Sequence, residues 1–234
     1  MAKRIILASG SPRRSELLTQ IGIPFEVITS QQDEIYKSSN PCEIVQELAQ
    51  MKASHVAKKL RTEIQKQKNE EQAKQERNGQ EQNDQEQMNE KQTYQEKQPA
   101  EELLVIGADT IVVLEEEILE KPVDVEDAFV MINKLQGRPH QVYTGVALIK
   151  YDANDKEQLR LFTEETKVFV HSMSEQEIRE YIAQGECFDK AGGYGIQGKF
   201  AAFIERIEGD YYNVMGLPLS RVYQEIKEWR AFFK

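Results

Sequence analysis

The chain has 234 residues and a formal net charge of −10 at pH 7. This length suits one large domain or two small ones, and the acidic balance argues against nucleic acid or a membrane surface as the main partner, because both attract proteins through basic surfaces. The two cysteines lie far apart and imply no disulfide framework, and no apolar stretch approaches the ~18 residues of a membrane helix or forms a signal peptide, so we expect a cytoplasmic protein.

The first predicted element is a short buried strand, Ile5–Leu7, which runs into a polar turn and then a helix. Ser11 suits the N-cap of that helix, and Pro12 suits its first position. A helix N-terminus attracts anions through its unpaired N–H groups. Arg13 and Arg14 lie in the same turn, where each positive charge opposes the helix dipole by about 0.3–1 kcal/mol. Two arginines there indicate a bound phosphate, although both could instead be solvated surface residues.

A second strand is predicted over residues 23–29, followed by a helix that begins at Pro41 and runs to about Leu60. Asn40 suits the N-cap of this helix. Glu43 is placed to reach back to it and complete a capping box.

On the same helix, Lys52 shares a stripe with Val45, Ala49 and Val56. The stripe predicts the buried face of the helix. The lysine could lie along that apolar surface with its charge in water, or it could point into a cleft.

Residues 61–100 differ in kind from their surroundings, because 11 of the 40 are Gln and 8 are Glu. Such a segment cannot bury enough surface to offset the entropy lost on ordering it. Its first part could extend the preceding helix, and the rest is predicted to be mobile. Both flanks resemble parts of one core, so we interpret the segment as an insertion within a single domain. A partner-binding role is an alternative that no motif supports.

The most apolar run, residues 103–114, predicts a central strand with Asp109 in its middle. An ionised carboxylate in a buried strand is unfavourable unless it is paired or holds a metal. The position therefore favours either a structural salt bridge or a metal site.

The rest of the chain alternates strands and helices, which is typical of an α/β protein. The predicted strands are 118–119, 142–151, 159–170 and 200–207. The predicted helices are one capped by Asp124, with Val125, Ala128, Ile132 and Leu135 on its apolar face, one opened by a capping box at Ser174, and one over 217–233. A loop at 189–198 holds four glycines within seven residues, which would let its backbone approach a ligand closely.

The unusual charged side chains fall into two groups. The basic candidates for binding a polyphosphate are Arg13, Arg14, Lys52, Lys121 and Lys190; the acidic candidates for holding a cation such as Mg²⁺ are Asp33, Glu34 and Asp109. Phosphate-binding cations and a carboxylate-held metal together favour attack at phosphorus. The Walker pattern is absent, and the three histidines have no zinc-site spacing. The residues thus indicate hydrolysis of a nucleoside triphosphate or a similar phosphate ester.

Several segments of the chain, taken together, resemble the Maf family of nucleoside triphosphate pyrophosphatases. They are ILASGSPRRSELL at 6–18, the Asp33-Glu34 turn, MKA at 51–53, IGADTIVV at 106–113, ILEKP at 118–122, LQGRPHQVYTGVAL at 135–148, DKAGGYGIQG at 189–198 and GDYYNVMGLP at 209–218. The match covers nearly the whole chain apart from 61–100. It implies one domain over 1–234, with the α/β fold shared with inosine triphosphate pyrophosphatases: a curved mixed sheet, flanking helices and a cleft between two lobes.

The resemblance also implies a reaction, Mg²⁺- or Mn²⁺-dependent cleavage of a nucleoside triphosphate to the monophosphate and pyrophosphate. The glycine-loop sequence is similar to that of the subgroup acting on dTTP and UTP. Family members are commonly homodimers. The insertion at 61–100 departs from the family pattern and, if it shields the cleft or the dimer surface, would alter these expectations.

Residue by residue, the family's functional positions fall on side chains of this sequence. The implied catalytic residues are Asp109, Lys52 and Lys121, and the implied metal ligands are Asp109 with Glu34 or Asp33. The implied substrate-binding residues are Ser9, Arg13, Arg14 and Gln197, to which Thr144 and Thr166 are added as cleft-lining residues and Lys190 as a further cation. A nucleotide-sensing regulator of cell division is the alternative function, although simple binding needs no carboxylate beside phosphates.

Overall fold

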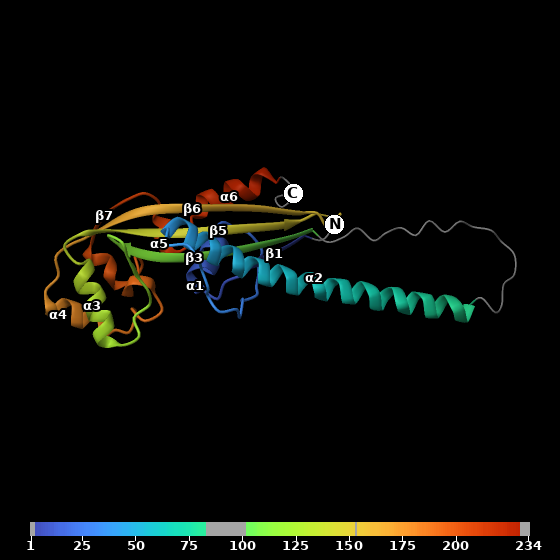
Figure 1. Cartoon of the computed structure of the whole chain (residues 1–234), viewed down its shortest axis with the longest axis horizontal. Coiled ribbons are helices and arrows are strands. Elements are labelled where there is room, and N and C mark those ends of the chain that lie inside the picture. Colours follow the sequence, from blue (N-terminus) through green and yellow to red (C-terminus); the bar gives the residue numbers. More distant parts are fainter. Residues whose placement is uncertain (1–2, 83–101, 153, 230–234) are drawn as a thin grey trace.

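The computed structural model describes residues 3–82, 102–152 and 154–229. Within these ranges the chain forms a mixed seven-stranded sheet of order β2-β1-β3-β5-β6-β7, with β4 beside β3 (Figure 1). The strands are β1 (Lys3–Leu7), β2 (Glu26–Val27), β3 (Glu102–Leu114), β4 (Glu117–Leu119), β5 (Pro139–Tyr151), β6 (Glu157–Val170) and β7 (Ile204–Glu208). The predicted α/β class is confirmed.

Helices pack on both faces of this sheet. They are α1 (Pro12–Gln20), α2 (Pro41–Gln82), α3 (Val125–Leu135), α4 (Glu175–Ile182), α5 (Tyr211–Met215) and α6 (Leu219–Glu228), with 3₁₀ turns η1 (Ala191–Gly193) and η2 (Lys199–Phe203). None of the helices in the described ranges combines the length and apolar character that crossing a membrane requires.

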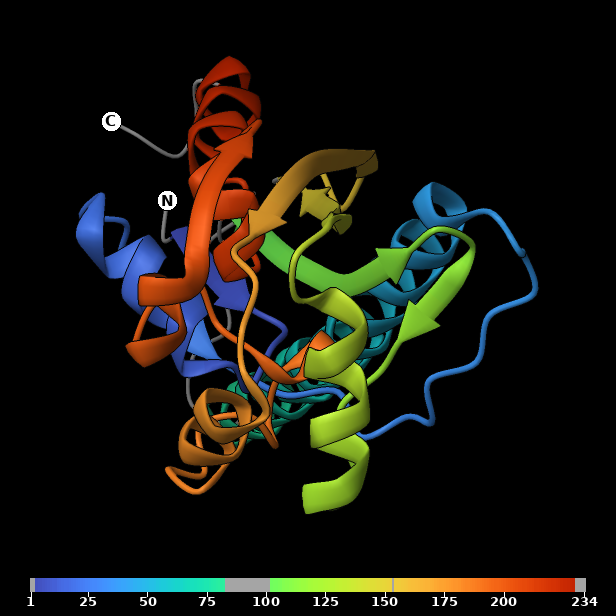
Figure 2. The same ribbon diagram turned by 90° about the vertical axis from the view of Figure 1, so that its left-hand side faces the viewer.

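The central strand β3 belongs to several parts of the core. Leu103 and Val105 pack against α2, whereas Leu104 and Ile106, on the opposite face, pack against α1 and α6. Further along that second face, Val112 packs against α3 and α4. One strand therefore joins two groups of helices, with α3 and α4 together at one end of the molecule (Figures 1 and 2).

The helix α2 meets the sheet at two glycines. A Cβ atom at Gly107 would lie 2.3 Å from the backbone oxygen of Ala49, and one at Gly145 would lie 2.2 Å from that of Val45. Such distances exclude any side chain, so the helix backbone rests directly on β3 and β5. Gly145 is the cross-strand partner of Asp109, so this close contact is made right beside the buried carboxylate.

Within the described residues, the middle of one edge of β3 is not paired with a neighbouring strand. β1 pairs with β3 as far as Ile106, and β4 pairs with it from Val112 onward. Between these two pairings, residues 107–111 face the space that separates β1 from β4, while their other edge pairs with β5. Side chains of Asp109 and Thr110 point to opposite faces of the sheet, and at this opening both reach the same space.

Two predicted strands differ from the structure. Of the strand expected over 23–29, only Glu26–Val27 forms a β-strand. In the strand expected over 200–207, the first residues form the 3₁₀ turn η2, because a period of three brings Phe200 and Phe203 together, with ring centroids 5.7 Å apart. The short helix α5 was not predicted, since five residues cannot display a helical period.

The predicted capping boxes have different outcomes. The box at Ser174 is confirmed. At the start of α2, Asn40 caps as predicted, but the carboxylate of Glu43 accepts a hydrogen bond from Ser38 Oγ at 2.6 Å. The backbone N–H of Asn40 donates instead to Ser38 Oγ at 3.0 Å, so Ser38 takes the place that the box gave to Glu43.

Two predictions concern helix faces and bounds, and a third concerns the insertion. Val125 lies in the first turn of α3, where it is 51% exposed, so its assignment to the apolar face was wrong. The closing helix, expected over 217–233, is observed as α6 from Leu219 to Glu228, and its last predicted residues, 230–233, lie outside the described part. The part of the predicted insertion at 83–100 also lies outside the described residues.

The first part of the predicted insertion is helical and continues α2 to Gln82, away from the sheet (Figure 1). Arg61 anchors this extension: its guanidinium lies 4.4 Å from the ring centre of Tyr151 and forms an ion pair with Asp155 in the β5–β6 turn. Tyr151 pairs with Leu103, six residues before Asp109, which is about 20 Å along β3. The extension therefore leaves the fold far from Asp109.

The contact at Gly145 gives a test of stability. We expect Gly145→Ala to lower the free energy of unfolding by at least about 3 kcal/mol, because the new methyl group meets helix backbone that cannot move aside. Gly185→Ala is the matched control: that position has open space but a φ of +75°, so the change should cost about 1–2 kcal/mol. Equal urea midpoints for the two variants would contradict this account.

Candidate active site

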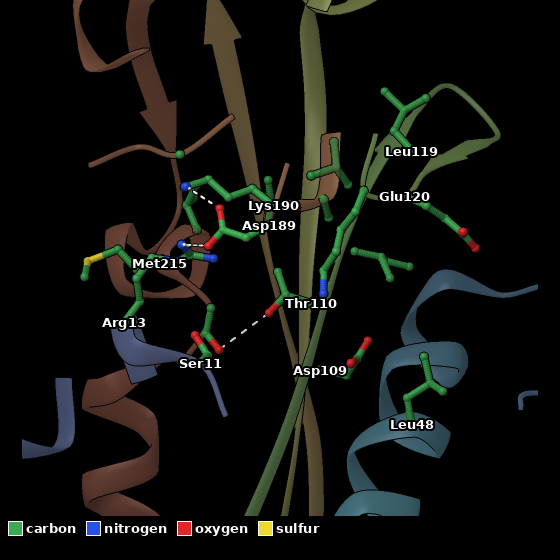
Figure 3. A pocket seen from close by; sticks show the side chains of 18 of the residues that line it. Ser11, Arg13, Leu48, Asp109, Thr110, Leu119, Glu120, Asp189, Lys190 and Met215 are labelled. Carbon is green, nitrogen blue, oxygen red and sulfur yellow. Dashed lines mark hydrogen bonds and ion pairs between the residues drawn. The ribbon is translucent and has the colours of Figure 1, made fainter. Parts of the chain in front are cut away.

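A cavity of about 440 Å³ lies at the opening in the edge of β3 (Figure 3). Its walls come from α1, α2, β3, β4, the segment between β2 and α2, and the glycine-rich loop at 189–198. The predicted site residues among its lining are Arg13, Arg14, Glu34, Lys52, Asp109, Lys121, Lys190 and Gln197. These residues are spread over 185 positions of sequence, from Arg13 to Gln197, and the fold brings them to one place.

Lys52 lies between two carboxylates. Its ammonium nitrogen pairs with Asp109 Oδ1 and, at 2.7 Å, with Glu34 Oε1. Asp109 is 8% exposed, and its charge is balanced inside the cavity wall. Of the two orientations left open for Lys52, the structure shows the one directed into the cavity. This orientation follows from α2 resting on Gly107 and Gly145, which carries Lys52 over the carboxylate.

Glu34 is held in its ionised form by its neighbours. Burial acts to raise the pKa of this carboxyl, but the hydrogen bond and the charge of Lys52, with the charges of Lys121 and Arg14, lower it below its usual value. At neutral pH, Glu34 is therefore a carboxylate that accepts a hydrogen bond from Lys52.

The two acidic neighbours in the predicted turn lie differently. Glu34 lines the cavity, whereas Asp33 is exposed and outside the lining. Asp109 and Glu34 together suit Mg²⁺, which commonly takes one or two protein carboxylates and completes its coordination with water and substrate phosphates. Within the described part of the chain, no group of three or more His, Cys, Asp or Glu side chains is arranged to hold a metal by itself. The donor set thus fits a metal shared with a phosphate substrate.

Arg14 is half-buried, and each of its three guanidinium nitrogens donates a hydrogen bond. Its guanidinium donates to Gly216 O at 2.7 Å, to Ser9 Oγ at 2.9 Å and to Thr110 Oγ1 at 3.0 Å. Burial lowers its pKa, and the nearby charge of Asp109 opposes that effect. An arginine stays charged at neutral pH even so, and its position is fixed.

Ser9 lies behind Arg14 rather than in the cavity lining. Besides its bond to Arg14, its hydroxyl oxygen accepts the backbone N–H of Ser11 at 3.3 Å. Ser11 begins α1 as predicted but makes no cap with its own side chain. The hydroxyl of Ser9 thus takes up one of the N–H groups at this helix start.

Thr144 and Thr166 do not line the cavity, contrary to the prediction, because both are completely buried behind it. Thr144 Oγ1 bonds to Thr110 Oγ1 at 2.9 Å and donates to the backbone oxygen of Asn213 at 3.0 Å. The side-chain amide of Asn213 donates in turn to Thr166 Oγ1 at 2.9 Å. This chain of hydrogen bonds supports Thr110 and, through it, Arg14.

The second arginine, Arg13, is bound differently. It donates to Asp189 Oδ2 at 3.0 Å, while Lys190 donates to Asp189 Oδ1 at 2.6 Å (Figure 3). Burial acts to raise the pKa of Asp189, but Lys190 and Arg13 lower it. One carboxylate therefore holds a cation of α1 and a cation of the glycine-rich loop side by side.

Sequence reasoning missed Thr110, Asp189 and Asn213. Thr110 had a usable signal, since it is a second polar residue beside Asp109 in an otherwise apolar strand. Asp189 and Asn213 had none, because Arg13, which binds Asp189, and the partners of Asn213 lie far away in sequence. Lys121 and Gln197 line the cavity as predicted residues, although their roles stay predictions.

The balance of charge in the cavity differs from that of the chain. Five basic side chains line it against the four acids Glu34, Asp109, Glu120 and Asp189, whereas the whole chain has 30 basic and 40 acidic residues. The cavity is thus a locally basic place on an acidic protein, as a phosphate site there requires.

The two arginines should differ in what they contribute to the fold. Arg14→Ala removes three charge-assisted hydrogen bonds, one each to Gly216 O and to two hydroxyls, so we expect it to lower the free energy of unfolding by about 3 kcal/mol. Arg13→Ala removes one ion pair with a carboxylate that is 61% exposed, and should cost less than about 1 kcal/mol. Urea denaturation of both variants measures this, and equal losses would show that the hydrogen bonds of Arg14 do not stabilise the fold.

Comparison with known proteins agrees with this geometry. The family model described as Maf-like protein matches residues 4–229. A dTTP/UTP pyrophosphatase of Agathobacter rectalis is 42% identical over 96% of this chain and 97% of its own length. Proteins of the same name from a Thermoanaerobacter species and from Carboxydothermus hydrogenoformans are 41% and 38% identical, over 96% and 97% of this chain and 95% and 98% of their own lengths.

Among solved structures, a nucleoside-triphosphatase (dITP/XTP pyrophosphatase) of Mycobacterium abscessus is similar, with a TM-score of 0.35 and 9% identity over 96% of this chain and 93% of that chain. Structural likeness at this level is weak, and the sequence relatives are far closer. With a family model over nearly the whole chain and relatives near 40% identity, this protein belongs to the Maf-like family.

Proposed function

We propose that this protein is a nucleoside triphosphate pyrophosphatase that hydrolyses dTTP and UTP, and modified pyrimidine triphosphates, to the monophosphate and pyrophosphate. The observation that carries the proposal is the position of Lys52 between Asp109 and Glu34, in a cavity whose opposite wall holds Arg13 and Arg14. The names of the relatives support the choice of dTTP and UTP.

In this proposal the basic residues bind the triphosphate. Arg14 presents a fixed charge, while Arg13 and Lys190 act as a pair from α1 and the loop. Gln197 lines the cavity on the same loop and would contact the substrate, as the family resemblance suggests. Ser9, with the buried Thr144 and Thr166, would act through Arg14 and its supports.

Water attacks the α-phosphorus, and the bond from that phosphorus to the oxygen bridging to the β-phosphate breaks. Asp109 would orient the water and accept its proton. Lys52 and Lys121 would face the charge that grows on the departing pyrophosphate. A divalent cation, Mg²⁺ or Mn²⁺, would be held by Asp109 and Glu34, not by Asp33, and would supply charge neutralisation at the phosphates.

We also propose a homodimer in the cytoplasm that takes neither nucleic acid nor a membrane as its partner. The family resemblance supports the dimer, and the net charge of −10 supports the absence of a nucleic-acid or membrane partner. The chain is proposed to be one domain over 1–234, interrupted at about 61–100.

A substrate panel tests the reaction. We expect pyrophosphate, rather than inorganic phosphate, from dTTP and UTP in the presence of Mg²⁺, with less from purine triphosphates. EDTA should abolish this release and added Mg²⁺ should restore it. Tight binding of nucleotides without any pyrophosphate, in Mg²⁺ or Mn²⁺, would favour the nucleotide-sensing role in cell division instead.

Asp109→Asn tests the proposed base and metal ligand. This change keeps the shape of the side chain but removes its charge, and we expect kcat for dTTP to fall by at least about a hundredfold. Asp155→Asn is the control, since it also removes a carboxylate from an ion pair but lies in the distant β5–β6 turn. Near-normal kcat in Asp109→Asn would rule out this role for the carboxylate.

A further inference from the structure

His140 of β5 and Tyr194 of the glycine-rich loop form a hydrogen bond inside the protein. His140 Nε2 lies 2.6 Å from the Tyr194 hydroxyl oxygen, and the two rings meet edge to face with centroids 5.3 Å apart. The exposed fractions are 0% for His140 and 5% for Tyr194. The bond joins the sheet to the loop, 54 residues further along the chain.

The chemistry of this pair is unusual for a core contact. Burial lowers the pKa of His140 to about 4 and raises the pKa of Tyr194, so both groups are neutral at physiological pH. His140 Nδ1 has no hydrogen-bond partner among the described residues. A buried polar atom without a partner is unfavourable, and an apolar side chain would avoid it. The benefit of a histidine here is the directed bond that it makes to Tyr194.

Other contacts in the described part of the chain also hold the loop. The backbone N–H of Gly192 donates to the carbonyl oxygen of Glu120, just after β4, at 2.9 Å. Gly192 also has a φ of +69° and packs so closely on Val112 of β3 that a Cβ would lie 3.0 Å from it. Tyr194 itself packs on Phe200, with centroids 4.7 Å apart.

The attached segment carries side chains that line the cavity. Lys190 lies four residues before Tyr194, Gln197 lies three residues after it, and Tyr194 also lines the cavity wall. Lys190 is also held by Asp189, but Tyr194 fixes the backbone between the two outer residues, so the place of both depends in part on where Tyr194 is held. His140 itself does not line the cavity, so any effect on the reaction must pass through Tyr194.

We propose that His140 is a positioning residue for the reaction: its hydrogen bond to Tyr194 sets the place of the loop 189–198, and so of Lys190 and Gln197, against the bound triphosphate. This inference rests on the proposed pyrophosphatase function. It assigns to the buried pair a role in substrate binding beyond the stability of the core.

Three variants test this role: His140→Phe, Tyr194→Phe and the double variant. Each keeps an aromatic ring and removes the hydrogen bond. The double variant also removes both buried polar groups, so its melting temperature should stay close to that of the unchanged protein. We expect KM for dTTP to rise about tenfold or more in each single variant, with no further rise in the double variant, because both changes break the same bond.

Two further variants complete the design. His140→Gln can present an amide near the position of Nε2 and should recover part of the lost affinity. Tyr151→Phe removes a buried tyrosine hydroxyl from the far end of the same strand, where it bonds to Glu157, and should leave KM unchanged. A double variant with normal KM overturns the inference.

Amide hydrogen exchange over residues 189–198 supplies a readout that needs no activity. We expect faster exchange in the double variant than in Tyr151→Phe. If the protein without substitutions releases no pyrophosphate, the proposed function is wrong. In that case, equal exchange rates over residues 189–198 in the double variant and in Tyr151→Phe would by themselves reject the positioning role. Faster exchange with a normal KM in an active protein would also overturn the inference, because the loop would then be free to move without effect on binding.

Discussion

The structure depends on the direct contact between the backbone of α2 and the sheet at Gly107 and Gly145. Both glycines lie on the face of the sheet that carries Asp109, one two residues before it and the other opposite it across the ladder. Because no side chain separates helix from sheet there, Lys52 reaches the buried carboxylate with a short, defined approach. The ion pair that would be unfavourable alone in a core is thereby satisfied, and Glu34 is drawn in from an irregular segment to the same ammonium group.

The opening in the edge of β3 explains why two faces of a sheet can serve one cavity. Asp109 faces α2 and Thr110 faces α1, yet β1 and β4 leave the intervening edge clear, so both residues meet the same space. The consecutive residues Arg13 and Arg14 of α1 make different kinds of contact. Arg14 is fixed by three partly buried hydrogen bonds, while Arg13 shares an exposed carboxylate with the neighbouring loop.

Much of this could be predicted from sequence where the signal was local. The strand–turn–helix around Arg13, the buried strand with Asp109 and the cap at Ser174 each depend on neighbouring residues, and each is observed. The predictions were wrong where contacts between residues far apart in the sequence determine the position of a side chain. Thr144 and Thr166 were expected in the cleft, but Asn213 and Thr110 hold them behind the wall. The bond between His140 and Tyr194 likewise depends on pairing β5 with a loop that no local pattern connects to it.

The contacts of Arg61 fix α2 to the sheet and so determine where the chain can accept inserted sequence. The helix leaves the sheet about 20 Å from Asp109, held by Tyr151 and Asp155, so sequence added beyond it does not disturb the geometry around Lys52. Lengthening a connection at such a point costs little entropy. This junction is therefore a natural acceptor for new segments during evolution, and a place where an engineer could insert a fluorescent or affinity module while the cavity stays intact.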